Sequence, residues 1–162
     1  MIRITKLTDY GIVLLSHIAR MPECKTRSVR DMAAETHLPL PTVSKLLKTL
    51  TRNGLLVSQR GVKGGYILAR KPEEITIAQI ISALDGPIAI TDCSGDPGGR
   101  CELERMCTVR TNWQRINVAI KDTLESLTLA EMARPTPGFV PLAMLTLPGG
   151  LATDGQTTGA IN

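Results

Sequence analysis

Aromatic residues are so rare in this sequence that they restrict the kind of core it can build. Only four of its 162 residues are aromatic, although 43% are hydrophobic. The core must therefore consist of Leu, Ile, Val, Ala and Met side chains. Because the strands of a β-sandwich favour aromatic and β-branched residues, this composition predicts packed helices with little sheet.

Apolar residues recur at helical spacing along much of the chain, and several of these segments follow a capping residue. Thr8 is expected to cap a first helix that ends by Pro22. Ser28 is expected to cap a second, short helix over residues 29–36. Thr76 has the same role for a later helix with the sequence IAQIISALDG.

The third helix and the segment after it complete a recognisable order of elements. Residues 42–53 carry apolar side chains on one face and have Pro41 in the first turn. Two short apolar stretches, 55–58 and 66–69, flank a Gly-rich basic loop, which is typical of a β-hairpin. Three helices followed by a hairpin form a winged helix-turn-helix. The expected fold class is therefore mainly α with a small β-hairpin wing, followed by a long C-terminal helix.

Charge is divided unequally between the two halves of the chain. Residues 1–71 hold 13 Lys and Arg against 4 Asp and Glu, a net charge of +9. Residues 72–162 hold 6 against 11, a net charge of −5, which leaves +4 for the whole chain. A basic head on an acidic body is typical of a nucleic-acid-binding domain joined to a regulatory or oligomerising part. A chance imbalance of surface charge is the plainer interpretation.

Polar and basic residues on the exposed side of the third helix predict contacts with double-stranded DNA. The N-terminal turns of such a helix enter the major groove, where hydrogen-bonding and cationic side chains read base edges and hold phosphates. The glycines of the hairpin tip let the backbone come close to the DNA, and Arg60 could reach the minor groove. Taken alone, the helix could equally have a solvated basic face. The predicted DNA-binding residues are Thr42, Ser44, Lys45, Lys48, Arg52, Arg60, Lys63, Gly64, Gly65 and Tyr66.

Three of the four cysteines, Cys93, Cys101 and Cys107, have the spacing C-x7-C-x5-C, and Cys24 stands apart. Thiolates are soft ligands that suit an iron–sulfur cluster or zinc. The sequence has no C-x2-C pair, so a common zinc-finger spacing is missing. Three thiolates leave one coordination position open, which suits a sensor better than a structural site. Three unrelated reduced thiols are the alternative.

A stripe of apolar residues predicts a long helix over about residues 108–127, which the segment LAEMA could extend. So long a helix has little to pack on within so small a chain, and dimerisation is favoured over burial inside one chain. The tail over residues 134–162 is expected to be irregular, with docking as an extended strand as the alternative. The predicted dimer residues are Val109, Trp113, Ile116, Ile120, Leu124 and Leu127.

The sequence also indicates a compartment and a class of protein. No apolar run approaches the length of about 18 residues that a membrane span needs, and the first residues are charged throughout, unlike a signal peptide. The cytoplasm is the expected location, and there cysteines stay reduced. We find no nucleotide-binding loop and no plausible acid–base pair, so no enzyme is expected. A small thiol protein for redox chemistry or cluster transfer is the alternative from another class.

Four motifs in order resemble the Rrf2 family of bacterial transcriptional regulators. They are LTDYGIVLLSHIA, PTVSKLLKTLTRNGLL, RGVKGGYILAR and ITIAQIISALDGPIAITDC. The resemblance covers about residues 1–133. Within the family, LTDYG, PTVSKLLK, DGPIAITDC and TNWQRIN look most like the regulators associated with the SUF iron–sulfur assembly operon.

The resemblance implies a homodimeric winged-helix transcription factor whose long C-terminal helix crosses its partner. It also implies that Cys93, Cys101 and Cys107 hold an iron–sulfur cluster. Some members use a His three residues after the third cysteine, where this sequence has Arg110. Others take an Asp from the first helix of the other protomer, a position that looks like Asp9. The alternative role for Asp9 is a favourable interaction with the dipole of its own helix.

The expected organisation is a DNA-binding domain over 1–71, a linker helix and cluster loop over 72–107, a dimerisation helix over 108–133 and a tail over 134–162. The predicted function is cluster-dependent control of SUF-type iron–sulfur assembly genes. A nitric-oxide-responsive or iron-responsive regulator of the same family is one alternative, and a zinc-stabilised DNA-binding module is another.

Overall fold

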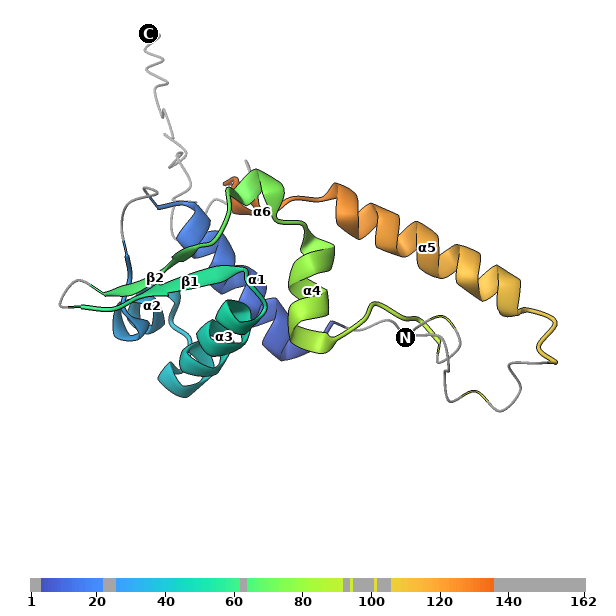
Figure 1. Cartoon of the computed structure of the whole chain (residues 1–162), viewed down its shortest axis with the longest axis horizontal. Coiled ribbons are helices and arrows are strands. Elements are labelled where there is room, and N and C mark those ends of the chain that lie inside the picture. Colours follow the sequence, from blue (N-terminus) through green and yellow to red (C-terminus); the bar gives the residue numbers. More distant parts are fainter. Residues whose placement is uncertain are drawn as a thin grey trace, which may run out of the picture.

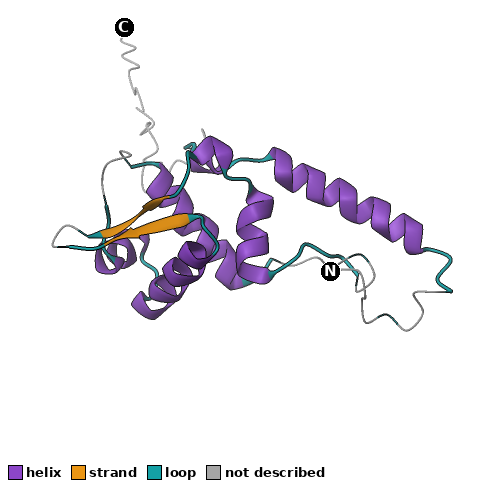
Figure 2. Ribbon diagram, in the orientation of Figure 1, coloured by secondary structure: helices purple, strands orange, loops and turns teal. Residues whose placement is uncertain are grey.

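The computed structural model describes residues 4–21, 26–61, 64–91, 94, 101 and 106–135. This part of the chain is mostly helical, and its strands form one two-stranded antiparallel hairpin (Figures 1 and 2). The predicted fold class is therefore confirmed. In chain order the elements are α1 (Lys6–Ala19), α2 (Val29–Thr36), α3 (Leu40–Arg52), β1 (Leu56–Gln59), β2 (Gly65–Leu68), the 3-10 helix η1 (Pro72–Glu74), α4 (Ile77–Asp85), α5 (Arg110–Ser126) and α6 (Leu129–Ala133).

Helix α1 begins one turn earlier than the sequence indicated. Its N-cap is Thr5, whose hydroxyl accepts a hydrogen bond from the backbone N–H of Thr8 at 3.2 Å. Thr8 is itself buried inside the helix. The prediction that Thr8 caps the helix was wrong, because two threonines three residues apart satisfy the same capping pattern and only the first precedes the helical turn.

The predicted caps of α2 and α4 are confirmed, and both are capping boxes. The Ser28 hydroxyl accepts from the backbone N–H of Asp31, and the Asp31 carboxylate accepts from the backbone N–H of Ser28. Thr76 and Gln79 do the same at the start of α4. Two otherwise unsatisfied backbone donors are paired in each motif, which fixes where each helix starts.

The hydrophobic core is built from aliphatic side chains and one methionine, as the composition predicted. It lies where α1, α2, α3 and α4 meet β1, with Tyr10 and Tyr66 packed only at its margin. The buried members of the core are Leu14, Leu15, Ile18, Met32, Val43, Leu46, Leu47, Leu50, Leu55, Leu56, Ile75, Ile77, Ile80, Ile81 and Leu129.

Leu129 belongs to this core because the chain returns to the head after α5. The backbone N–H of Ile77 donates to the carbonyl of Leu127 at 2.9 Å, and the N–H of Leu129 donates to the carbonyl of Ile75 at 2.8 Å. Thr128 then caps α6 as a separate helix, so LAEMA does not extend α5. Figure 1 shows the outcome: α5 extends away from the head while α6 packs back against α1 and η1.

None of the helices in the described ranges is long and apolar enough to cross a lipid bilayer.

Candidate DNA interface and cysteine loop

Helix α3 has one buried face and one basic face. Val43, Leu46, Leu47 and Leu50 are buried. Three cations, Lys45, Lys48 and Arg52, are exposed on the other side of the helix, because positions three and four apart share a face. Thr42 and Ser44 are half-buried at the margins between the two faces. The helix therefore presents an uninterrupted basic surface to solvent.

The first turn of α3 adds a residue that the sequence did not single out. The helix begins at Leu40, two residues before the predicted start, with Pro39 as its N-cap and Pro41 in its first turn. Leu40 is 45% exposed. An exposed aliphatic side chain at the tip of such a helix could contact a thymine methyl group in the major groove. Its signal in the sequence was an apolar residue outside the buried stripe.

The wing is an antiparallel hairpin in which Leu56 pairs with Leu68 and Gln59 with Gly65. Each strand is shifted by one residue from its predicted bounds. Arg60 is exposed at the tip, whereas Lys63 lies outside the described residues. The tip therefore offers one described cation beyond those of α3.

The two glycines at the tip end of the wing are required by close backbone contacts within the protein. A Cβ atom on Gly64 would lie 2.5 Å from the carbonyl oxygen of Gln59, and one on Gly65 would lie 2.6 Å from the carbonyl carbon of Arg27. Gly65 precedes Tyr66, whose N–H donates to the Arg27 carbonyl at 3.0 Å. Both glycines thus permit close backbone contacts inside the protein, and the approach of the wing backbone to DNA stays a prediction.

Arg27 also belongs to an ion-pair chain that connects the wing to α1 and α2. Its guanidinium lies 3.0 Å from Glu35, whose other carboxylate oxygen lies 2.8 Å from Nε2 of His17. Tyr66 is half-buried and packed against the core, so it has a structural role besides its predicted DNA contact. His37 is exposed at the left-handed C-cap of α2, with φ of 56°.

The structure places two of the three predicted cluster ligands. Cys101 and Cys107 are free thiols and half-buried, and Cys93 lies outside the described residues. Within the described ranges, no three His, Cys, Asp or Glu side chains come together as a metal site. The Cys107 carbonyl accepts a bond from the N–H of Arg110, the first residue of α5. The last cysteine is therefore attached to the start of the long helix.

Asn117, in the middle of α5, binds backbone groups at the start of the cysteine loop, which spans residues 93–107. It is 7% exposed and the only buried residue of that helix. Its Oδ1 accepts from the N–H of Ile90 at 3.1 Å, and its Nδ2 donates to the carbonyls of Ile88 at 3.2 Å and Ser94 at 3.1 Å. Sequence reasoning missed this residue because an Asn in an amphipathic helix reads as surface. The only signal was its place beside the apolar stripe.

The turn that Asn117 holds is ordered by its own side chains. The N–H of Thr91 donates to Oγ of Ser94 at 3.0 Å, and the N–H of Ser94 donates to the Thr91 carbonyl at 3.0 Å. Residues 92 and 93 lie between them in sequence. Thr91 and Ser94, the nearest described residues on either side of Cys93, are thus bonded to each other, and Ser94 is also bonded to α5.

Asp9, which the family resemblance offers as a cluster ligand from the other protomer, is exposed in the first turn of α1. The carboxylate that bonds to the N-cap of this helix comes from the end of α4 instead. Thr5 donates to Asp85 through its hydroxyl at 2.7 Å and its backbone N–H at 3.3 Å. The geometry therefore leaves the Asp9 carboxylate facing solvent on the outside of the head.

The predicted dimer stripe lies on one side of α5 and is partly covered within the chain. Leu124 packs against the core at the end of the helix nearest the head, and Ile120 is half-buried. Val109, Trp113 and Ile116 are exposed, as is Leu127 at the C-cap. The exposed members of the stripe are therefore Val109, Trp113 and Ile116 in the part farthest from the head, and Leu127 at the other end.

Comparison with known proteins shows which protein family this chain resembles. Residues 4–135 match the model of the Rrf2 family, described as an iron-dependent transcriptional regulator. A candidate HTH-type transcriptional regulator of Synechocystis sp. is 32% identical over 130 residues, which cover 80% of this chain and 86% of that protein. The HTH-type transcriptional regulator IscR of Pectobacterium carotovorum is 29% identical over 80% of this chain and 78% of its own.

Solved structures agree with the sequence relatives. CymR, the global cysteine regulator of B. subtilis, has a TM-score of 0.65 and 30% identity, covering 82% of this chain and 97% of its own. IscR of T. potens has a TM-score of 0.61 and 26% identity, covering 81% and 85%.

Proposed function

This chain belongs to the Rrf2 family of DNA-binding transcriptional regulators, and from that premise we propose that it senses an iron–sulfur cluster. In this proposal it acts in the cytoplasm as a homodimer and controls SUF-type iron–sulfur assembly genes. Being a transcriptional regulator like its relatives, it is not an enzyme.

The observation that carries the proposal is the attachment of the cysteine loop to α5. Asn117 holds one end of the loop and the Cys107 carbonyl meets the start of the helix at the other. The opposite end of α5 packs against the core of the DNA-binding head through Leu124, and Leu129 of the following helix α6 is buried in that core. A ligand that orders the loop would therefore act on a helix connected directly to the head, which is what a sensor requires.

The chemistry of the donor set fits an iron–sulfur cluster. Cys93, Cys101 and Cys107 would supply three thiolates, and the two described ones are free and half-buried. When bound, the cluster would supply a group that iron limitation, oxidants or nitric oxide can remove. An exposed Asp9 could complete the coordination from the partner protomer as a weak ligand. A nitric-oxide-responsive or iron-responsive regulator with the same ligands remains the alternative function.

DNA recognition is proposed to use α3 and the wing of each protomer. The first turn of α3 would enter the major groove, with Thr42 and Ser44 near base edges and Lys45, Lys48 and Arg52 near phosphates. Arg60, Lys63, Gly64, Gly65 and Tyr66 belong to the wing. Two copies joined along α5 through Val109, Trp113, Ile116, Ile120, Leu124 and Leu127 would place two such heads on one pseudo-palindromic operator.

The decisive experiment measures iron, acid-labile sulfide and zinc per protomer after purification without oxygen. We expect iron and sulfide in equal amounts, lost in Cys93→Ser, Cys101→Ser or Cys107→Ser. Cys24→Ser is the matched control and should keep both. Zinc alone, or no metal, would refute the sensor while leaving the DNA-binding regulator intact.

DNA binding is tested in parallel with an operator from a SUF-type gene cluster, with and without the cluster. Affinity should fall steeply with salt, and Lys48→Ala should reduce the slope of log affinity against log salt by about one. Equal affinity of the loaded and empty protein at every salt concentration would contradict sensing.

A further inference from the structure

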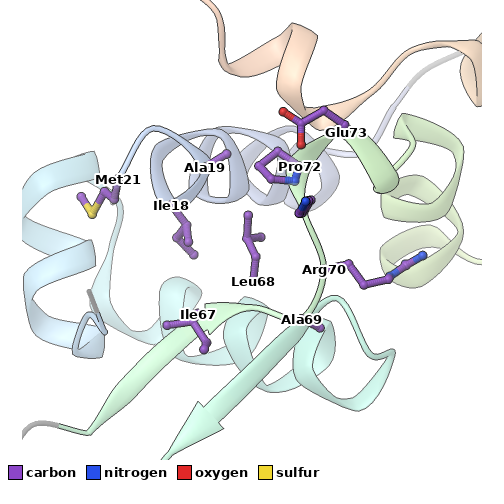
Figure 3. Close-up of a pocket in the computed structure, with 10 residues that line it drawn as sticks. Ile18, Ala19, Met21, Ile67, Leu68, Ala69, Arg70, Pro72 and Glu73 are labelled. Atoms are coloured by element: carbon purple, nitrogen blue, oxygen red, sulfur yellow. The ribbon is translucent and has the colours of Figure 1, made fainter. Parts of the chain in front are cut away.

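A cavity of about 370 Å³ lies between the end of α1, strand β2 and the turn that leads to α4 (Figure 3). Its walls include Ile18, Ala19 and Met21 on one side and Ile67, Leu68 and Ala69 on the other. The proposed contacts with DNA, cluster and partner use none of these residues. The volume falls within the range of about 300–1,000 Å³ that is usual for binding sites.

The cavity has a mixed lining, with apolar side chains from α1 and β2 and charged side chains from the turn that leads to α4. Figure 3 shows the Arg70 side chain directed toward α4. Its guanidinium donates to the Glu74 carbonyl at 3.3 Å and to the side chain of Gln79 at 3.1 Å. Lys71, Pro72 and Glu73 complete the lining. A peptide segment with apolar side chains would suit this mixed lining, because its backbone groups could pair with the polar part.

The chain leaves α6, the last helix of the described residues, beside this cavity. Nε of Arg20 donates to the carbonyl of Ala133, the last residue of α6, at 2.7 Å. Ala19 and Met21, the neighbours of Arg20, both line the cavity. Arg134 has extended backbone, with φ of −62° and ψ of 135°, and directs the chain out of α6.

The segment that follows has a composition that suits the cavity. Residues 136–162 contain a single charged side chain, Asp154. Residues 139–147, with the sequence FVPLAMLTL, are apolar at every position except Thr146. Leaving such a stretch in water is unfavourable. Phe139 follows Pro135 by four residues, a reach of about 13 Å in extended chain.

We propose that residues 139–147 of the same chain occupy this cavity and hold the wing against α1. The occupied cavity would brace β2, which forms one wall, so the tail would set how firmly the wing is presented to DNA. The proposal does not depend on the cluster.

The short connection makes such docking effective even if the contact is weak. A tether of this length gives an effective concentration in the millimolar range, so a segment with an intrinsic Kd of about 0.1 mM would be bound about ten times as often as free. Local opening of the covered strand should slow by a similar factor, on the order of tenfold.

Hydrogen exchange measured by mass spectrometry tests the proposal on four proteins. They are the full chain, a chain that ends at Pro135, the full chain with Leu142→Asp and Leu145→Asp, and a control with Thr157→Asp and Thr158→Asp. The control adds the same charge to the polar end of the tail. The shortened chain keeps α6 and every described core residue, and it spans the family match.

We expect peptides over residues 16–21 and 65–73 to exchange about tenfold more slowly in the full chain and the control than in the other two proteins. Equal rates in all four would overturn the proposal. Protection that fades on dilution would show that the tail binds a second copy instead. Protection retained by the shortened chain, with a small molecule found in the native mass spectrum, would assign the cavity to that molecule.

Discussion

Helices α3 and α5 are both amphipathic, yet they differ in what covers their apolar residues. α3 buries Val43, Leu46, Leu47 and Leu50 within its own chain. α5 is four residues longer and buries only Asn117. The apolar face of α3 is buried within its own chain, whereas most of the apolar face of α5 is exposed to solvent. A hydrophobic stripe alone therefore does not reveal whether a helix stabilises a fold or an assembly.

The largest effect is expected on folding stability, from truncation of a side chain on the buried face of α3. Leu46 is fully buried, so Leu46→Ala should lower the free energy of unfolding by about 2–5 kcal/mol through lost burial and a residual cavity. Urea unfolding followed by circular dichroism measures it. The same truncation on α5, Ile116→Ala, should change the unfolding of the monomer by much less. Equal losses would remove the distinction between the two helices.

The open side of α5 should respond to charge through assembly rather than folding. Ile116→Asp is expected to raise the dimer dissociation constant at least about 30-fold, equivalent to losing about 2 kcal/mol at an interface centre. Val118→Asp is the matched control, because Val118 is exposed two residues further along the helix, on another face. Sedimentation equilibrium reports both. A dimer that tolerates Ile116→Asp as well as Val118→Asp would place the interface elsewhere.

The buried polar residue of α5 sharpens the comparison. Asn117→Ala removes the partner of three backbone groups, and leaving buried groups unpaired costs about 1–3 kcal/mol. Hydrogen exchange should accelerate at residues 88–91, and the iron content after gel filtration should fall. Asn112→Ala, at an exposed position of the same helix, should change neither. If exchange rises while iron content stays constant, Asn117 orders the segment but does not support the cluster.

The smallest effect is expected on the local stability of α6 at low pH. Bonds from the Thr128 backbone N–H and then its hydroxyl hold the pKa of Glu131 below its usual value of 4.5. A lowered folded pKa means that this stabilisation is present above about pH 4.5 and is lost as pH falls through the folded pKa. Exchange in α6, corrected for intrinsic rates, should therefore rise as the pH is lowered below about 4.5. Glu131→Gln should flatten that rise, whereas Glu125→Gln should preserve it.

Local patterns predicted the parts of the fold that are decided locally. The caps at Ser28 and Thr76 came from side chains that bond within three residues, and the buried face of α3 came from its spacing of leucines. The hairpin followed from two short apolar stretches around glycines. Each of these features is readable because sequence neighbours are also spatial neighbours.

Features that depend on distant partners were missed. Thr5 and Thr8 both fit a capping position, and the carboxylate of Asp85, which bonds to Thr5, lies 80 residues away in the sequence. Asn117 looked like surface because the backbone groups it binds lie more than twenty residues away. The return of the chain at Thr128 broke a helix that periodicity alone would have continued.

That return also bears on how the protein is made. Leu129 is fully buried in the core of the head, and its backbone pairs with Ile75. A ribosome that has synthesised the winged helix and α4 has therefore not yet supplied everything that the head contains. The DNA-binding surface becomes fully supported only after α5 has emerged and α6 has docked. A chain whose translation stops before α6 would lack this part of the core. Its head should therefore be less stable, and a fragment without the long helix should bind DNA less well.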